Sequence, residues 1–289
     1  MQALGSRILV VAFDGWNDAG EAATSAIDLI RHDHEYERVH TVDPELYFDY
    51  QYTRPMVSWG ADGQRTLRWP EAGLWRPLQK SELNDADVQV PEAWLLTGSE
   101  PARAWQAFTA EFMDLALRDD VTGVVTIGAM LSDVPHTRPI SIFASSQNEQ
   151  VREELGLEKS LYEGPVGILS AIEHAAEQAG LPTASLWASV PHYVASTAPS
   201  PKATLALLDR FHEMSGIDVP RENLRTQAAT WEASIDAAAA EDDEMADYIR
   251  HLERARDTWD SPEASGDAIA QAFERYLRRN DPNSGDHKR

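Results

Sequence analysis

Polar and charged side chains follow the apolar segments of this sequence at several points. They are carboxylates, a carboxamide, imidazoles and guanidinium groups, which are types that bind ligands and transfer protons. The candidates are Asp14, Asn17, Asp18, Glu45, Arg54, Glu100, Asp133, His136, Arg138 and His192. Ligands of open α/β sheets bind beyond the carboxyl ends of the strands. We therefore expect these side chains to lie on one rim that forms a ligand-binding or functional site.

Each candidate has a chemical and a structural interpretation. Asp14 ends an apolar segment. Burial there would raise its pKa and suit it to be a general base; alternatively, its carboxylate accepts hydrogen bonds within a turn. Arg54 and Arg138 would clamp an anion, and His192 would carry a proton. Arg54 would alternatively pair with Asp49, and a histidine at a strand end is often structural. The sequence leaves these alternatives open.

Two loops bring several of these groups close together. The segment GWNDAG (15–20) places glycines before a predicted helix, an arrangement that binds anions at helix N-termini. It also matches a tight turn between a strand and a helix, capped by Asn17 or Asp18. The second loop contains Asp133, His136 and Arg138, whose side chains are suited to acyl or phosphoryl chemistry or to hydrogen bonds that stabilise the loop.

The sequence contains no strong catalytic or cofactor motif. GWNDAG matches neither G-x-G-x-x-G nor a Walker loop, and both G-x-S-x-G and H-E-x-x-H are absent. The chain has no Cys, which excludes disulfides, cysteine–zinc sites and thiol nucleophiles. We therefore assign no catalytic residue, no metal and no cofactor.

Composition narrows the classes of partner. Asp and Glu number 48 against 25 Lys and Arg, which gives a net charge of −23. This charge repels phosphate backbones and anionic lipids, so we expect no nucleic-acid or membrane partner. No run approaches the roughly 18 apolar residues that span a bilayer, and residues 1–13 lack the pattern of a signal peptide. These features predict a cytoplasmic protein.

Apolar runs and amphipathic stretches alternate up to residue 219. Strands are predicted at 8–13, 38–42, 94–97, 123–127, 140–144 and 185–190, with a hairpin at 56–59 and 66–69. Helices are predicted from a capping box at Asp18 and Glu21, from Ser99 with Pro101 in the first turn, and at 165–180 and 202–214. This order predicts an α/β fold, a three-layer α/β/α sandwich with a mainly parallel sheet.

The pattern changes after residue 219. Strand signals stop, Ala and acidic residues become frequent, and apolar residues recur at helical spacing, among them Ile249, Leu252 and Trp259, and later Ile269 and Phe273. We predict an α/β/α domain over 1–219, an acidic helical domain over 220–280 and a disordered tail over 281–289.

Several motifs in order resemble one known family. They are FDGWNDAGEAAT (13–24), PELYFDYQYTRP (44–55), LLTGSEPARAW (95–105), GAMLSDVPHTRP (128–139) and SVPHYV (189–194). Together they look like the PAC2 family, which is named for the eukaryotic proteasome assembly chaperone 2, and specifically like its actinobacterial branch of unknown function. The resemblance covers roughly residues 9–214, and the acidic helical segment after it is also similar to that branch.

The resemblance implies an α/β/α domain with nucleoside-phosphorylase-like topology, often assembled as homotrimers. It implies no established activity, because eukaryotic members are binding chaperones for proteasome α-subunits and archaeal relatives look like assembly factors. Some relatives carry a C-terminal hydrophobic-Tyr-X tail. This sequence ends in Asp286-His287-Lys288-Arg289, so docking through such a tail is not expected.

We hypothesise a non-catalytic, homo-oligomeric assembly or protein-interaction factor, similar to a proteasome assembly chaperone. The alternative is an enzyme or binder of a small molecule, a nucleoside or phosphorylated metabolite, that uses the strand ends. In that alternative Asp14 is the base, Arg54 or Arg138 clamps the anion and His192 shuttles the proton. A third hypothesis is a purely structural trimer without a ligand.

Overall fold

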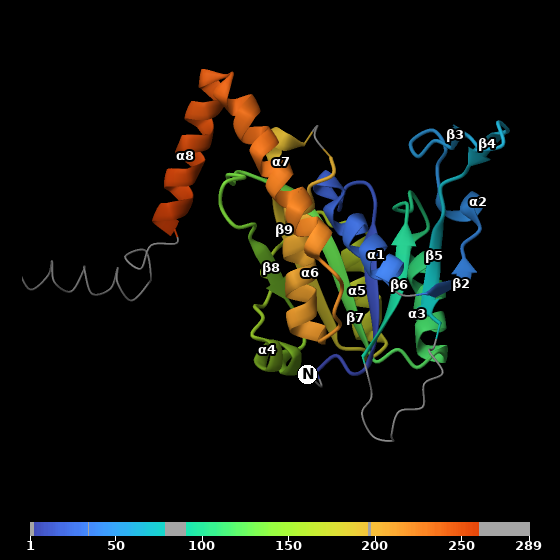
Figure 1. Cartoon of the computed structure of the whole chain (residues 1–289). Coiled ribbons are helices and arrows are strands. Elements are labelled where there is room, and N and C mark those ends of the chain that lie inside the picture. The colour runs from blue at the N-terminus through green and yellow to red at the C-terminus, as the bar shows by residue number, and fades with distance from the viewer. Residues whose placement is uncertain (1–2, 34, 79–90, 196–197, 260–289) are drawn as a thin grey trace, which may run out of the picture.

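A seven-stranded sheet forms the centre of the molecule, in the order β2-β5-β6-β1-β7-β9-β8 (Figure 1). The computed structural model describes residues 3–33, 35–78, 91–195 and 198–259. The strands are β1 (Arg7–Phe13), β2 (Tyr36–Thr41), β5 (Ala72–Pro77), β6 (Glu92–Gly98), β7 (Gly123–Ser132), β8 (Ile142–Ser145) and β9 (Thr183–Pro191). The central strands β6, β1, β7 and β9 are parallel to one another, while β5 and β8 run antiparallel to their neighbours. The predicted mainly parallel α/β sheet is confirmed.

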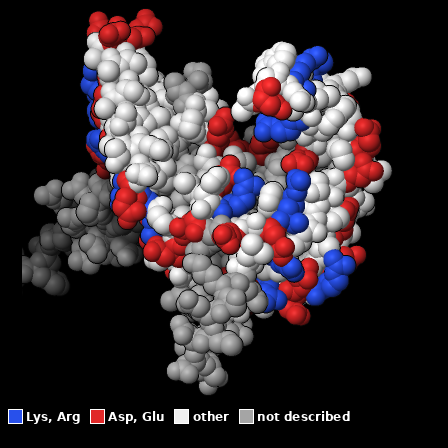
Figure 2. Space-filling model, turned by 45° about the vertical axis from the view of Figure 1, so that its right-hand side comes forward, with Lys and Arg blue, Asp and Glu red and all other residues white. Residues whose placement is uncertain are grey.

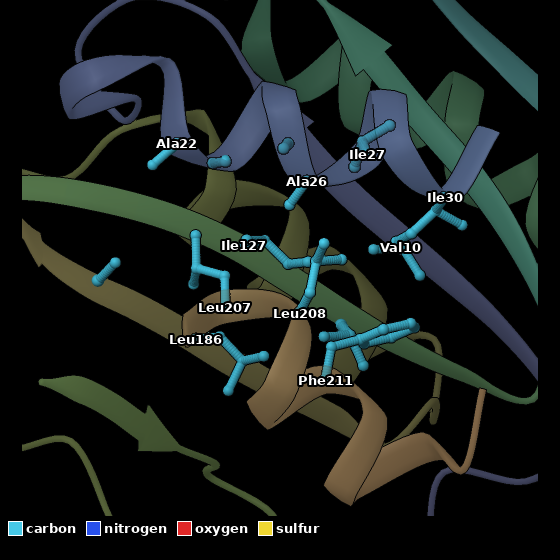
Figure 3. Close-up of a cluster of buried hydrophobic side chains, with 14 of the residues drawn as sticks. Val10, Ala22, Ala26, Ile27, Ile30, Ile127, Leu186, Leu207, Leu208 and Phe211 are labelled. Carbon is cyan, nitrogen blue, oxygen red and sulfur yellow. The ribbon is translucent and has the colours of Figure 1, made fainter. Parts of the chain in front are cut away.

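Helices α1 (Ala22–Asp33) and α6 (Pro201–Ser215) cover one face of the sheet. Small residues of α1, such as Ala22 and Ala26, allow it to approach the strands closely (Figure 3). Ile27 of α1 and Leu207 and Phe211 of α6 complete this layer and are almost fully buried. Burial of each such side chain contributes about 1.5–3 kcal/mol, so this layer is a main source of stability.

Helices α3 (Trp105–Arg118) and α5 (Ile168–Gln178) cover the opposite face. Their apolar side chains, including Phe108, Phe112 and Ile172, pack against β1 and β6. The short helix α4 (Glu149–Leu155) follows β8, and its Val151 packs into the core on the α1–α6 side. Helix α4 therefore does not cover the face of β8 and β9 on which α5 lies.

A small hairpin stands apart from the main sheet. Its strands are β3 (Met56–Trp59) and β4 (Arg65–Arg68), and every residue in them is exposed. The hairpin follows the short helix α2 (Pro44–Tyr47) and projects beside β5, at the upper right of Figure 1. This confirms the hairpin that the sequence predicted.

Two further helices, α7 (Glu222–Ala240) and α8 (Asp243–Trp259), project from the body of the molecule (Figure 1). Three side chains of α7, Leu224, Trp231 and Ile235, pack into the same core as α1 and α6. The predicted domain boundary at 219/220 and the tail over 281–289 stay predictions. The helical stripe expected beyond residue 260, with Ile269 and Phe273, and that tail both lie outside the described residues.

Local details differ from the sequence predictions at two helix starts. Helix α3 begins at Trp105, with Ala104 at its N-cap, so the cap predicted at Ser99 is wrong. The carbonyl of Pro101 instead accepts a hydrogen bond from the Trp105 indole. At α1 the Asp18 carboxylate accepts N–H groups beyond Glu21, and 3₁₀ turns occupy Ala19–Glu21 and His192–Val194. Strand β5 and helix α4 were not predicted.

The end of β6 requires glycine, and Gly98→Ala tests this. Gly98 has φ +148°, and an added Cβ would lie 2.1 Å from the carbonyl oxygen of Glu71. Because backbone must move to relieve that contact, we expect Gly98→Ala to lower the free energy of unfolding by roughly 2–4 kcal/mol in urea titrations. Gly180→Ala is the control: φ is +80° but the space around it is open, so it should cost about 1–2 kcal/mol. Equal losses for the two variants would contradict the steric argument.

Candidate functional site

The polar residues that follow β1 and β6 form one hydrogen-bonded cluster, which we call the β1–β6 cluster (Asp14, Asn17, Ser99 and Glu100). The Asp14 carboxylate accepts the Ser99 hydroxyl at 3.0 Å and the Glu100 N–H at 3.1 Å. One oxygen of Glu100 accepts the Asn17 side-chain amide at 2.8 Å and the N–H of Ile168 at 3.0 Å. Glu100 therefore caps the first turn of α5, and Asp14 is exposed rather than buried as a general base would be.

Asn17 lies at the centre of this cluster and has no exposed surface. Its backbone carbonyl accepts the N–H of Ala129 in β7 at 2.8 Å. Its side-chain oxygen has no hydrogen-bond partner. A Cβ at Gly167 would lie 2.2 Å from that oxygen, so glycine is needed where the chain enters α5. Asn17 thus links the ends of β1, β6 and β7 to the start of α5.

Asp18 is buried and serves α1. One carboxylate oxygen accepts the N–H of Ala23 at 2.7 Å and that of Thr24 at 3.3 Å, while the other accepts the Thr24 hydroxyl. Burial raises the pKa of Asp18, and these hydrogen bonds oppose the rise. The carboxylate satisfies N–H groups at the start of α1, which is a capping role.

The histidine of the 133–138 loop is buried against α7. His136 has no exposed surface; its Nδ1 lies 2.8 Å from the Tyr193 hydroxyl and its Nε2 lies 3.1 Å from the Asp236 carboxylate. Lys202 donates to the His136 carbonyl and to the Glu232 carboxylate, each at 2.5 Å. Burial lowers the pKa of His136, which favours the neutral ring. Burial also raises the pKa of Tyr193 to about 12.

Arg138 holds α8. Its guanidinium donates to both carboxylate oxygens of Asp257, at 2.7 and 2.8 Å, and to Glu253 at 3.2 Å. The hydrogen bonds from Arg138 lower the pKa of Asp257. Thr137 donates to Glu253 at 2.5 Å. The guanidinium predicted to clamp an anionic ligand is therefore bound to carboxylates of this chain.

Asp133 and His192 lie at the same end of β7 and β9. His192 Nδ1 is 3.2 Å from the Asp133 carboxylate, and the His192 ring packs edge-on against Tyr248 of α8, with centroids 5.6 Å apart. Together with His136 and Arg138, these residues form what we call the helix-docking cluster (Asp133, His136, Arg138 and His192), because each contacts α7 or α8 or a residue that does.

Glu45 and Arg54 belong to a third region, between α2 and the hairpin. The Glu45 carboxylate accepts the Tyr50 hydroxyl at 3.1 Å, and Arg103 donates to the Glu45 backbone carbonyl at 2.6 Å. Arg54 is exposed two residues before β3. The expected single rim is therefore divided: the β1–β6 cluster, the helix-docking cluster and this region have separate hydrogen-bond networks among the described residues.

One cavity was not foreseen from the sequence. It has a volume of about 820 Å³ and lies between α5, strands β8 and β9 and the loop before α5. Its polar lining includes Glu173 and Ser185, which bond with Thr126. These residues lie inside a helix and inside strands, whereas the functional residues were predicted at strand ends. The alternation of Thr183 and Ser185 along β9 was the one sequence pattern that could have indicated a polar face on this strand.

In the described ranges, no group of three or more His, Asp or Glu side chains is placed to hold a metal ion. Within those same ranges, no helix is long and apolar enough to cross a bilayer.

Comparison with known proteins identifies the family. The model of the PAC2 family matches residues 12–239. This chain belongs to the PAC2 family. A PAC2 family protein from Streptomyces avermitilis is 35% identical, with a TM-score of 0.73, over 84% of this chain and 99% of its own. The Mycobacterium tuberculosis proteasome-assembly chaperone homologue Rv2125 is 36% identical, with a TM-score of 0.72 and the same coverage. The predicted PAC2 resemblance is confirmed.

A more distant solved structure shares the fold alone. Pyrococcus furiosus PbaB, an archaeal proteasome activator, is 13% identical, with a TM-score of 0.61 over 81% of this chain and 93% of its own. No curated protein matches this chain.

Glu100 accepts two of the hydrogen bonds that hold the β1–β6 cluster to α5, and Glu100→Ala tests how much they stabilise the protein. The variant leaves the buried Asn17 amide and the Ile168 N–H without their acceptor, so we expect a loss of roughly 2–4 kcal/mol in the free energy of unfolding. Glu100→Gln retains an acceptor and should lose less than Glu100→Ala. The exposed Glu163 in the loop before α5 is the control, and Glu163→Ala should change stability by less than about 0.5 kcal/mol. A loss that is no larger for Glu100→Ala than for Glu163→Ala would refute the capping role.

His136 makes stability depend on pH. Its pKa in the folded protein lies below 6.5 because the ring is buried, although Asp236 and Glu232 oppose that shift. Between the two pKa values the unfolded chain binds more protons, so the free energy of unfolding should fall as pH drops below about 6.5, by at most about 1.4 kcal/mol per pH unit. Urea titrations from pH 7.5 to 5 measure this slope. His136→Gln should flatten it, and the partly exposed His212→Gln should not; equal slopes in all three proteins would rule the mechanism out.

Proposed function

We propose that this PAC2 protein is a non-catalytic, homo-oligomeric assembly factor that binds protein subunits, in the manner of a proteasome assembly chaperone. The similarity to the mycobacterial proteasome-assembly chaperone homologue supports this role. The geometry supports it as well, because the candidate catalytic groups bind one another or the C-terminal helices. The alternative enzyme gains no such support, since its base Asp14 and its shuttle His192 lie in different clusters. We further propose that it acts in the cytoplasm.

The observation that carries the proposal is the exposed hairpin. Cross-strand pairs place Val57, Leu67, Trp59 and Arg65 on one face of β3 and β4. The apolar members of this face, which we call the hairpin face, are 45% (Val57), 51% (Leu67) and 72% (Trp59) exposed. A two-stranded hairpin with an uncovered apolar face is only marginally stable by itself. Contiguous exposed apolar surface of this kind is typical of interaction sites.

Charge favours a second copy of this chain as the occupant of the hairpin face. Arg54, Arg65 and Arg68 lie on or beside the hairpin, whereas the whole chain carries a net charge of −23. Basic side chains gather on this projecting part of the molecule (Figure 2). A basic hairpin that docks on a different, acidic surface of its neighbour makes a head-to-tail contact, and such contacts form a ring when the rotation between neighbours closes. We therefore propose a homotrimer.

Removal of the two largest apolar groups should dissociate the oligomer. We expect the wild-type protein to have the mass of a trimer by native mass spectrometry, and Trp59→Ser/Leu67→Ser to shift to the monomer. Met56→Ser is the matched control: Met56 is exposed on the other face of the same hairpin, so the trimer should persist. A monomeric wild type, or a double variant that stays trimeric, would contradict the proposed interface.

The assembly role is tested by reconstitution. Separately purified α- and β-subunits of the host proteasome are mixed with and without the wild-type protein, and formation of the core particle is followed on native gels. We expect faster assembly with the wild type and a slower rate with Trp59→Ser/Leu67→Ser. Assembly at the same rate with and without the protein would refute the role.

A further inference from the structure

The cavity of about 820 Å³ has the size of a small-molecule site. Residues of α5, β8 and β9 and of the loop before α5 form its walls. It lies on the α5 side of β8 and β9, whereas Val151 of α4 packs into the core on the other face of the sheet. Gly15, Trp16 and Gly167, which are sequence or contact neighbours of Asn17, also line it.

Ser145 and Ser185 line the cavity together with the carboxylate of Glu173, and Thr126 of β7 pairs with Ser185 behind that lining. Strand register aligns Thr126 of β7 with Ser185 of β9, and Ser185 with Ser145 of β8. The Thr126 hydroxyl donates to the carboxylate of Glu173, which reaches down from α5, and the Thr126 oxygen lies 3.0 Å from the Ser185 hydroxyl. The Trp187 indole donates to Ser185 at 3.1 Å. The Glu173 carboxylate is thus the charged acceptor in this group of hydroxyls.

The chemistry around Glu173 favours a positively charged ligand group. Among the described residues that line the cavity, none is Lys or Arg, and Glu173 is the one with a formal charge. Burial raises the pKa of Glu173 and the negative charge of Glu177 adds to the rise, while hydrogen bonds from Thr126 and Ser185 oppose it. A cation would neutralise this buried carboxylate, whereas a phosphate or carboxylate would meet it with like charge.

The upper walls are apolar and aromatic. Trp187 and Phe143 are cross-strand partners. Near the opening, Trp16, Leu161 and Tyr162 are 68%, 84% and 66% exposed. An apolar or aromatic body would bury these side chains, and aromatic faces also attract cations.

We propose that this cavity binds an amphipathic organic cation, whose protonated amine or amidinium pairs with Glu173 and whose apolar body packs against Trp187 and Phe143. This site differs from the strand-end rim considered for a phosphorylated metabolite, and it excludes that ligand class by charge. It is also independent of the hairpin face, so either proposal can fail without the other.

The test uses two probes of similar shape and opposite charge on the full-length protein. Tryptamine carries an ammonium group on an indole, and indole-3-propionate carries a carboxylate on the same ring. Titrations followed by ligand-observed NMR should show saturable binding of tryptamine at millimolar concentration and none of indole-3-propionate. Absence of tryptamine binding, or equal binding of the two probes, would overturn the proposal.

Variants then locate the binding. Glu173→Gln should weaken tryptamine binding by roughly tenfold or more, while Glu163→Gln, in the loop before α5 but outside the lining, should leave it unchanged. Circular dichroism checks that each variant is folded. If Glu173→Gln does not fold, Ser170→Trp provides the second variant, because Ser170 lines the cavity from α5 and a larger ring there should abolish binding. Unchanged affinity in the folded Glu173→Gln protein, or in Ser170→Trp, would refute the site.

Discussion

The buried side chain of Asn17 is the contact on which the arrangement of the strand ends depends. Its amide donates to Glu100 after β6, and it lies against Gly167 at the start of α5, while the Asn17 backbone carbonyl accepts the N–H of Ala129 in β7. Because Glu100 also caps α5, one pair of side chains sets the position of that helix relative to the sheet. Other positions of these two side chains are unfavourable, because loss of a hydrogen-bond partner here would leave further buried polar atoms unsatisfied. The cavity beside α5 inherits its shape from this arrangement.

The polar groups at the ends of β7 and β9 hold the C-terminal helices instead of a ligand. His136, Arg138 and Asp133 contact residues of α7 and α8 or their partners. Acidic residues of those helices neutralise the guanidinium of Arg138, so the same groups are not free to clamp a ligand. The 133–138 loop, whose residue types suggest catalysis in the sequence, is therefore a packing surface for helices of the same chain. This explains how a PAC2 protein keeps polar strand ends without a recognised catalytic motif.

Two surfaces remain open to other molecules, and they differ in chemistry. The hairpin face is exposed, apolar and flanked by arginines, which suits a macromolecular partner with an acidic surface. The cavity is concave and lined by a carboxylate, hydroxyls and aromatic rings, which suits a small molecule. They lie on different elements, β3–β4 and α5–β9. The proposed subunit interface and the proposed ligand site are thus at separate places on the chain.

The sequence by itself determined the α/β class, most of the strands and helices, the hairpin and the PAC2 resemblance. Those properties follow from local periodicity, turn residues and linear motifs. It did not indicate β5, whose segment AGLWRP contains Gly and Pro but is held between β2 and β6 by pairing on both sides. The sequence also proposed Asp14, Asn17 and Glu100 as site residues, and the structure brings these three together. It placed Arg138 on the same rim, but in the folded chain Arg138 bonds to Asp257 of α8 instead. Glu173, Thr126 and Ser185 meet only through strand register and the packing of α5, so no local pattern encodes their contact.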